Sequence, residues 1–282
     1  MRQSTMRANN LKWVRNVAMF FVVAAVWIFY FFPIYWMVTT SFKTRVDTFS
    51  IPPKWLFWPT IQYYISSFTD PKFLKVIQNS LIITGTTVLF SLVLGAWAAY
   101  AFARFRFKGS LAMSFSLIIA RMMPPIVFIV PLYLLFNSLK LRNTHIGLIL
   151  IFTVFNLPFT VWMLKSFFEE VPIELEEAAW IDGASRLQAL GRVILPLIAP
   201  GLAATAVFAA LLAWNEFLFA LLLGGPDTTT LPVFLSGFLG ERDVEWGDIM
   251  ATATVAVLPP TLLVMLVQQN LIKGLTLGAV KG

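Results

Sequence analysis

Six long apolar runs dominate this sequence and constrain its fold more than any other feature. Four of them contain no Asp, Glu, Lys or Arg: residues 16–42, 76–103, 143–164 and 249–272. Two further runs contain one charge each, Arg121 within 109–139 and Glu216 within 193–226. Each run exceeds the ~20 residues with which an α-helix crosses ~30 Å of hydrocarbon. The pattern predicts an all-α integral membrane protein with six transmembrane helices.

The composition supports the same class and excludes several others. Hydrophobic residues make up 59% of the chain and charged residues 12%, whereas soluble domains average about half and about a quarter. The absence of Cys and the presence of a single histidine, His145, argue against a disulfide framework, a metal site and most triad chemistry. The net charge of +7 comes from basic residues that flank the apolar runs, so we expect a lipid bilayer and no nucleic acid as partner.

The distribution of Lys and Arg predicts the orientation. With the N-terminus inside the cell, twelve of these side chains lie on the cytoplasmic side and eight lie outside. The basic cluster at residues 104–108 is the strongest part of this bias. We therefore expect cytoplasmic tails at 1–15 and 273–282 around a membrane domain at 16–272. The first run is longer than the ~7–15 apolar residues of a signal peptide, so we expect it to remain as a span.

The loop at about residues 165–192 is polar and predicts two short helices. Its first helix begins with three carboxylates near the positive end of the helix dipole: Glu174, Glu176 and Glu177. Gly183 is suited to the left-handed turn that ends a helix. Ser185 with Gln188 three residues later fits a capping box that opens the second helix.

The same loop carries a small-residue surface that another protein can approach closely. The residues that form it are Ala178, Ala179 and Ala184. Two interpretations stay open at this level: a docking element for a partner protein, or an ordinary amphipathic helix at the membrane surface.

Four motifs together resemble one family. The first is Glu177-Ala178-Ala179, then three residues, Gly183, nine residues and Val193-x-Leu195-Pro196. The others are the longer run Glu177-Ala178-Ala179-Trp180-Ile181-Asp182-Gly183-Ala184, the stretch Trp214-Asn215-Glu216-Phe217, and residues 273–282. The chain is similar to the permease subunits of binding-protein-dependent carbohydrate ABC importers, closest to the maltose type. One departure is Val193, which stands where isoleucine is common in that family.

The resemblance implies a fold, partners and a mechanism. The fold is the type I ABC importer permease fold in the bacterial inner membrane. The partners are a second, different permease subunit, two ATPase subunits that bind ATP and Mg, and an external solute-binding protein. This chain would bind no cofactor and would not be the enzyme, since it lacks the Gly-x-x-x-x-Gly-Lys-Ser/Thr loop. It would move a sugar or polyol.

The resemblance also assigns residues that couple transport to the ATPases. They belong to the loop at 165–192: Glu176, Glu177, Ala178, Ala179, Asp182, Gly183 and Ala184. ATP-driven closure of the ATPases would move this loop and switch the pathway between inward and outward access.

Charges inside the membrane are costly and usually functional. Arg121 and Glu216 are either a buried ion pair or part of a polar pathway surface. In the second interpretation Trp214 stacks on a pyranose ring, and Asn215 and Glu216 bond hydroxyl groups. The predicted pathway residues are therefore Arg121, Trp214, Asn215 and Glu216.

Two further features leave alternatives open. The loop at 224–248 is rich in Gly, Thr and acidic residues and is either a solvated linker or a contact for an external partner. The small residues Gly95, Ala96, Ala98 and Ala99 suit close helix contact. An ion-coupled secondary transporter is the alternative function, but such folds usually show repeated halves and acidic sites in the membrane, and Glu216 is the only intramembrane acid.

Overall fold

The computed structural model describes the backbone of residues 2–238 and 245–277, and the side chains of Trp13 and residues 15–238 and 245–268. Within these residues the regular elements are helices, without a strand. They form two compact units, one of Met1–Thr69 with Glu241–Ala256 and one of Asp70–Gly240 with Val257–Gly282. The predicted C-terminal tail at 273–282 lies outside the described residues from position 278 onward.

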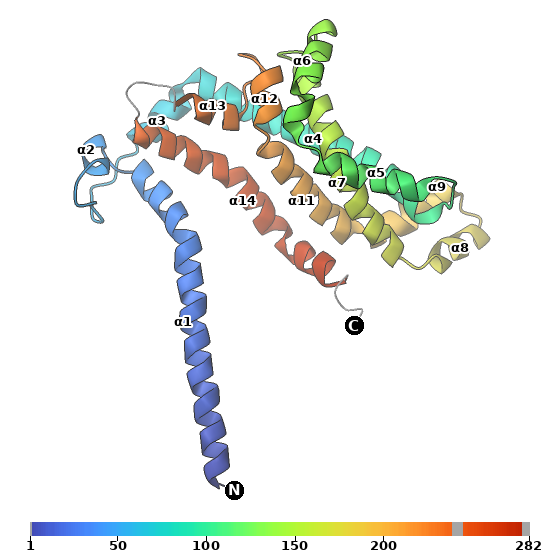
Figure 1. Ribbon diagram of the computed structural model, residues 1–282, viewed down its shortest axis with the longest axis horizontal. Coiled ribbons are helices and arrows are strands. Elements are labelled where there is room, and N and C mark those ends of the chain that lie inside the picture. The colour runs from blue at the N-terminus through green and yellow to red at the C-terminus, as the bar shows by residue number, and fades with distance from the viewer. Residues whose placement is uncertain (1, 239–244, 278–282) are drawn as a thin grey trace. The chain divides into compact units, whose positions relative to one another are not determined.

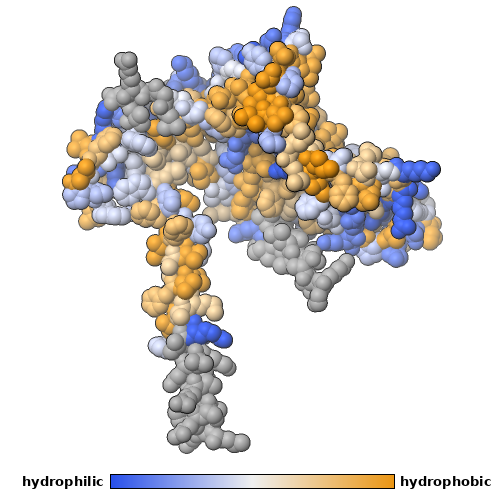
Figure 2. All heavy atoms as spheres, viewed as in Figure 1, coloured by the Kyte–Doolittle hydropathy of each residue, from blue (hydrophilic) through white to orange (hydrophobic). Residues whose placement is uncertain are grey.

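The first unit is built on a long, apolar helix. It contains α1 (Arg2–Ser41), α2 (Arg45–Thr48), α3 (Gln62–Thr69) and the beginning of α14 (Trp246–Leu277). The apolar part of α1 spans Arg15–Ser41, and none of its most hydrophobic window is buried within the chain. Figure 2 shows apolar side chains along this helix. Such a surface is stable where lipid or another apolar helix surrounds it.

The second unit packs three long helices around its core. Its elements are α4 (Pro71–Arg104), α5 (Ser110–Met122), η1 (Pro125–Phe128), α6 (Ile129–Ser138), α7 (His145–Glu170), α8 (Glu174–Ile181), α9 (Arg186–Ala189), the π-helical η2 (Leu190–Ile194), α10 (Leu195–Leu197), α11 (Ala199–Trp214), α12 (Leu218–Leu223), α13 (Leu231–Gly237) and the rest of α14. Helices α4, α7 and α11 lie side by side (Figure 1). They contribute buried residues such as Ile83, Phe152 and Ala213 to one apolar cluster.

Small residues allow the closest of these contacts. A Cβ atom added to Gly95 of α4 would lie 2.6 Å from the Cγ2 atom of Thr160 on α7, so only glycine fits there. Ala99, one turn further along α4, is fully buried in the same interface. The predicted role of the small-residue patch in helix contact is confirmed at these two positions.

Two of the six predicted spans are bent pairs of helices rather than single rods. Four helices of the described chain are long and apolar enough to cross a membrane, and the number is six if each bent pair counts as one span. The 109–139 run bends by 92° between α5 and the η1–α6 segment. Met123 and Pro124 are extended there because a residue that precedes proline disfavours the α conformation.

The 193–226 run is broken twice. It bends by 76° at Ile198, where α11 begins with Pro200 in its first turn; proline has no N–H to continue a helix from the preceding turn. The run is interrupted again at residues 215–217, before α12. The prediction of six spans is confirmed if each bent pair is counted as one span, and prolines and local caps interrupt these two runs despite their apolar composition.

Candidate functional site

The loop between α7 and α11 folds as its sequence predicts. Helix α8 ends at Ile181, and Gly183 follows with φ = +86°, a left-handed conformation that glycine adopts without a Cβ penalty. The Ser185 hydroxyl accepts a hydrogen bond from the Gln188 backbone N–H, and the Gln188 side chain accepts one from the Ser185 N–H. This capping box opens α9, so the turn between the two short helices is set by local interactions.

Glu176 anchors this loop to the end of α4. Its carboxylate forms an ion pair with the Arg104 Nε atom and accepts a 2.9 Å hydrogen bond from the Tyr100 hydroxyl. Arg104 also donates to the Val171 carbonyl oxygen at 2.8 Å. The side chains of Arg104 and Glu176 are 9% and 1% exposed. The sequence placed Glu176 with the coupling residues, but the structure turns its carboxylate inward, away from any partner surface.

The remaining predicted coupling residues lie on the outside of the loop. Exposed positions are Glu177, Ala178, Asp182 and Gly183, and half-buried positions are Ala179 and Ala184. Two apolar residues that the sequence interpretation did not assign to the coupling surface also lie on it. Ile181 is 87% exposed and Leu187 is 64% exposed. The available signal was an apolar residue beside polar ones at each position, Ile181 before Asp182 and Leu187 between Arg186 and Gln188. The loop thus presents an acidic and apolar surface, suited to a groove with basic and apolar walls.

Arg186 holds the two short helices against the segment that follows α4. Its guanidinium lies 5.1 Å from the centre of the Trp180 ring and 5.2 Å from that of Phe105. A guanidinium between two aromatic faces gains from both ring quadrupoles. Together with the Arg104–Glu176 pair, this contact fastens the loop to the end of α4 and to the segment that follows it.

A second candidate site is a cavity of about 510 Å³ within the second unit. Arg121 from α5 and Glu216 from the break between α11 and α12 both line it. Glu216 accepts a 3.0 Å hydrogen bond from the Phe219 backbone N–H. The Arg121 guanidinium donates to the Phe155 carbonyl oxygen at 3.4 Å and lies 5.4 Å from the centre of the Phe159 ring.

The two charges share this cavity but do not pair. Among the described residues no ion pair joins Arg121 to Glu216, so the ion-pair interpretation is not what the structure forms. The cavity also contains Asn156, which is 4% exposed and whose amide oxygen has no hydrogen-bond partner. The sequence interpretation missed Asn156, although a polar residue in the middle of an apolar run was a signal. A cation, a carboxylate and an amide therefore line one space in the membrane domain.

The other two predicted pathway residues lie elsewhere. Trp214 is buried and lines a separate apolar pocket of about 290 Å³ beside Pro259 and Pro260. Asn215 is exposed, and its side chain donates to the Leu211 carbonyl oxygen at 2.8 Å. Adjacent residues point to different spaces here because α11 ends at Trp214 and the chain turns.

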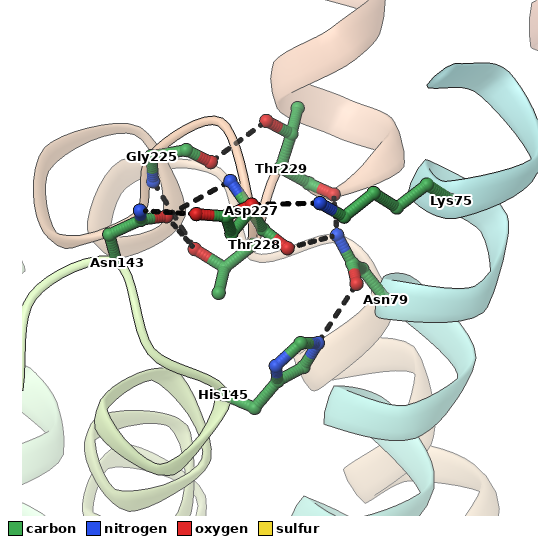
Figure 3. Close-up of polar contacts among 8 residues, drawn as sticks. All are labelled: Lys75, Asn79, Asn143, His145, Gly225, Asp227, Thr228 and Thr229. Carbon is green, nitrogen blue, oxygen red and sulfur yellow. Dashed lines mark hydrogen bonds and ion pairs between the residues drawn. The ribbon is translucent and has the colours of Figure 1, made fainter. Parts of the chain in front are cut away.

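The start of the loop at 224–248 is held by a network of polar contacts (Figure 3). Asn143 donates to the Asp227 carboxylate at 3.1 Å and accepts from the Asp227 backbone N–H at 3.1 Å. Lys75 of α4 forms a 2.8 Å ion pair with Asp227. The side-chain amide of Asn79 donates to the carbonyl oxygens of Asp227 and Thr229, and its own oxygen lies 2.8 Å from the His145 Nε2 atom. This segment is anchored to α4 and to Asn143, just before α7, and is not a loose linker.

The charge of Asp227 depends on the same contacts. The hydrogen bond from Lys75, followed by the one from Asn143, lowers the pKa of Asp227. The anchored form of this segment therefore contains the ionised carboxylate.

Comparison with known proteins gives a consistent result. The family described as binding-protein-dependent transport system inner membrane component matches residues 91–277. The diacetylchitobiose uptake system permease protein DasC of Streptomyces coelicolor is 37% identical over 255 residues, which cover 89% of this chain and 92% of that protein. The trehalose/maltose transport system permease protein MalG of Thermococcus litoralis is 35% identical over 255 residues, covering 89% and 91%.

A solved structure has the same fold. It belongs to a bacterial ABC transporter involved in the import of the acidic polysaccharide alginate, with a TM-score of 0.77 and 21% identity over 91% of this chain and 96% of that chain. This likeness confirms the predicted permease fold.

Proposed function

Since the chain belongs to the family of binding-protein-dependent transport system inner membrane components, we propose that it is a permease subunit of an ATP-driven importer for a sugar or related polyol. The observation that carries this proposal is the loop at 165–192. It is anchored inside by Glu176 and displays Glu177 and Ile181 outward. A loop that is rigid on one side and exposed on the other is suited to transmit a movement from a bound partner.

The partners follow from this role. Two ATPase subunits receive the loop and bind ATP and Mg, while this chain binds no nucleotide and catalyses no reaction. A second, different permease completes the pathway, and an external solute-binding protein delivers the substrate. The loop then faces the cytoplasm together with both termini, and the membrane domain extends over 16–272. Relatives whose names state uptake of diacetylchitobiose or of trehalose and maltose support a carbohydrate as substrate.

The cavity beside Arg121 and Glu216 is the part of this chain that we assign to the pathway. Its volume of about 510 Å³ lies within the ~300–1,000 Å³ range of small-molecule sites. The carboxylate of Glu216 and the amide of Asn156 offer acceptors and donors to sugar hydroxyl groups. No observation favours the ion-coupled secondary transporter.

Transport by the reconstituted complex tests the proposal. Uptake of labelled sugars into liposomes should require ATP, the ATPase subunits and the binding protein. A matched control contains an ATPase variant that binds ATP without hydrolysing it, and it should show no sustained uptake. Uptake by this chain alone in response to an ion gradient would contradict the proposal.

A further inference from the structure

Lys43 is a buried cation at the end of the first span. Its side chain is almost inaccessible, since the residue is 3% exposed. The ammonium group lies 4.4 Å from the centre of the Trp36 ring and 5.2 Å from that of Phe57. These rings stabilise the charge in part, but an ammonium has three N–H donors that rings do not replace. Within the described residues the ammonium forms no ion pair or hydrogen bond to an acceptor.

Carboxylates of the same unit bind other cations. Asp47, four residues further along the chain, forms a 2.5 Å ion pair with Lys54. Glu245 pairs with Arg45, also at 2.5 Å. The pKa of Asp47 is lowered mainly by its hydrogen bond from Lys54 and to a lesser degree by the charge of Lys43, so Asp47 acts on Lys43 without forming an ion pair with it among the described residues. A buried charge without a direct partner is unfavourable, so an anion that contacts Lys43 would be stabilised.

A cavity of about 250 Å³ adjoins this cation, and all of its lining residues belong to the first unit. Thr40 and Lys43 line it together with the aromatic rings of Trp36, Phe49 and Trp246. The Thr40 hydroxyl is buried and has no hydrogen-bond partner in the described part of the chain. A cation without an ion pair and a hydroxyl without a hydrogen-bond partner, among the described residues, thus line one small space with aromatic walls.

The position of the cavity along the first span indicates which anion can reach it. The apolar span Arg15–Ser41 ends two residues before Lys43, so this residue lies at the level of the lipid headgroups. The cavity is smaller than the ~300–1,000 Å³ of sites that enclose whole small molecules. We propose that this cavity binds the phosphate group of a phospholipid, with Lys43 and Thr40 as donors and the aromatic rings against the glycerol backbone and first acyl carbons.

Lipid titration of the full-length protein tests this site. The protein is purified from membranes with the subunits that accompany it, stripped of lipid in detergent, and titrated with dioleoyl phosphatidylglycerol while native mass spectrometry counts bound lipid. One molecule should bind more tightly than the rest, and Lys43→Met should weaken it about tenfold or more, the loss expected for a charge-assisted hydrogen bond. Lys72→Met, which removes an exposed cation at the start of α4 in the second unit, should leave binding unchanged.

Further arms separate the possible sources of binding. Lys43→Arg should retain the lipid because it keeps the charge, and Thr40→Val should lose several-fold affinity even if Lys43→Met fails to assemble. A dioleoyl galactolipid without phosphate should bind weakly and should not respond to Lys43→Met. Equal binding of this galactolipid, or equal loss in the Lys72→Met protein, would overturn the proposal. Displacement of the tight lipid by millimolar inorganic phosphate alone would also overturn it, because a free anion would then be the ligand.

Discussion

Breaking the Arg104–Glu176 ion pair should lower the stability of this protein. Replacing both residues should restore the stability without restoring the coupling of transport to ATP hydrolysis. In the variant Arg104→Ala the Glu176 carboxylate remains buried by its own chain, with only the Tyr100 hydroxyl as a donor among the contacts described. Removal of one partner of a buried pair typically destabilises a protein by about 3–5 kcal/mol. For a unit of this size, that corresponds to a fall in melting temperature of roughly 6–20 °C.

Replacing both partners distinguishes the two effects. The double variant Arg104→Met, Glu176→Leu leaves no buried charge uncompensated, so it should recover much of the lost stability. It should nevertheless transport poorly, because the charged connection between α4 and α8 is gone and a movement of the loop no longer reaches α4. The ratio of sugar imported to ATP hydrolysed in liposomes measures this coupling, and the melting temperature of the assembled complex measures stability.

A surface pair provides the matched control. Lys165 and Glu169 form a 3.1 Å ion pair one helical turn apart on α7, with side chains 29% and 51% exposed. Glu169→Gln should change stability by no more than about 0.5 kcal/mol and should leave the transport ratio unchanged. Equal melting temperatures for Arg104→Ala and Glu169→Gln would refute the reasoning. So would a double variant that imports as much sugar per ATP hydrolysed as the unchanged protein.

Three further predictions concern the turn, the cavity and the anchored loop. Gly183→Ala should destabilise the loop by roughly 1–2 kcal/mol through its left-handed backbone and not through a collision, since no atom lies within 4 Å of the added Cβ; chemical denaturation measures this loss, and an unchanged midpoint would contradict it. Arg121→Met and Glu216→Gln should show a coupling energy of no more than about 1 kcal/mol in a double-mutant cycle, the low end for side chains that share a cavity, because no ion pair joins them among the described residues; a coupling energy of about 3 kcal/mol or more would show that they do pair. Asp227 has a lowered pKa because of Lys75 and Asn143, so its anchoring contribution should be complete above its unfolded pKa of about 3.9 and should disappear only as the pH falls through the lower folded value. The protection of residues 224–230 against hydrogen exchange, taken relative to the intrinsic rate at each pH, should therefore stay constant from neutral pH to about pH 5, and in Asp227→Ala it should be lower already at neutral pH; protection that falls between pH 7 and 6 in the unchanged protein would contradict this assignment.

Features that depend on neighbours along the chain could be predicted from the sequence. The apolar runs indicated a membrane protein because hydrocarbon requires a fixed number of consecutive apolar residues. Gly183 and the pair Ser185 and Gln188 indicated the turn of the coupling loop because caps involve residues within one helical turn. The motif around Glu177 indicated the family because its residues are consecutive in the chain.

Features that depend on contacts between distant segments required the tertiary structure. Glu176 and Glu177 are adjacent and chemically alike, yet one is buried against Arg104, 72 residues away, and the other is exposed. Arg121 and Glu216 line one cavity without pairing, and Asn156 of α7 lines it with them. The sequence alone determined the apolar runs, the turn of the coupling loop and the family motifs. The packing of α4, α7 and α11 decided which side each residue faces, because a rotation of about 100° per residue along a helix separates a core position from a surface position.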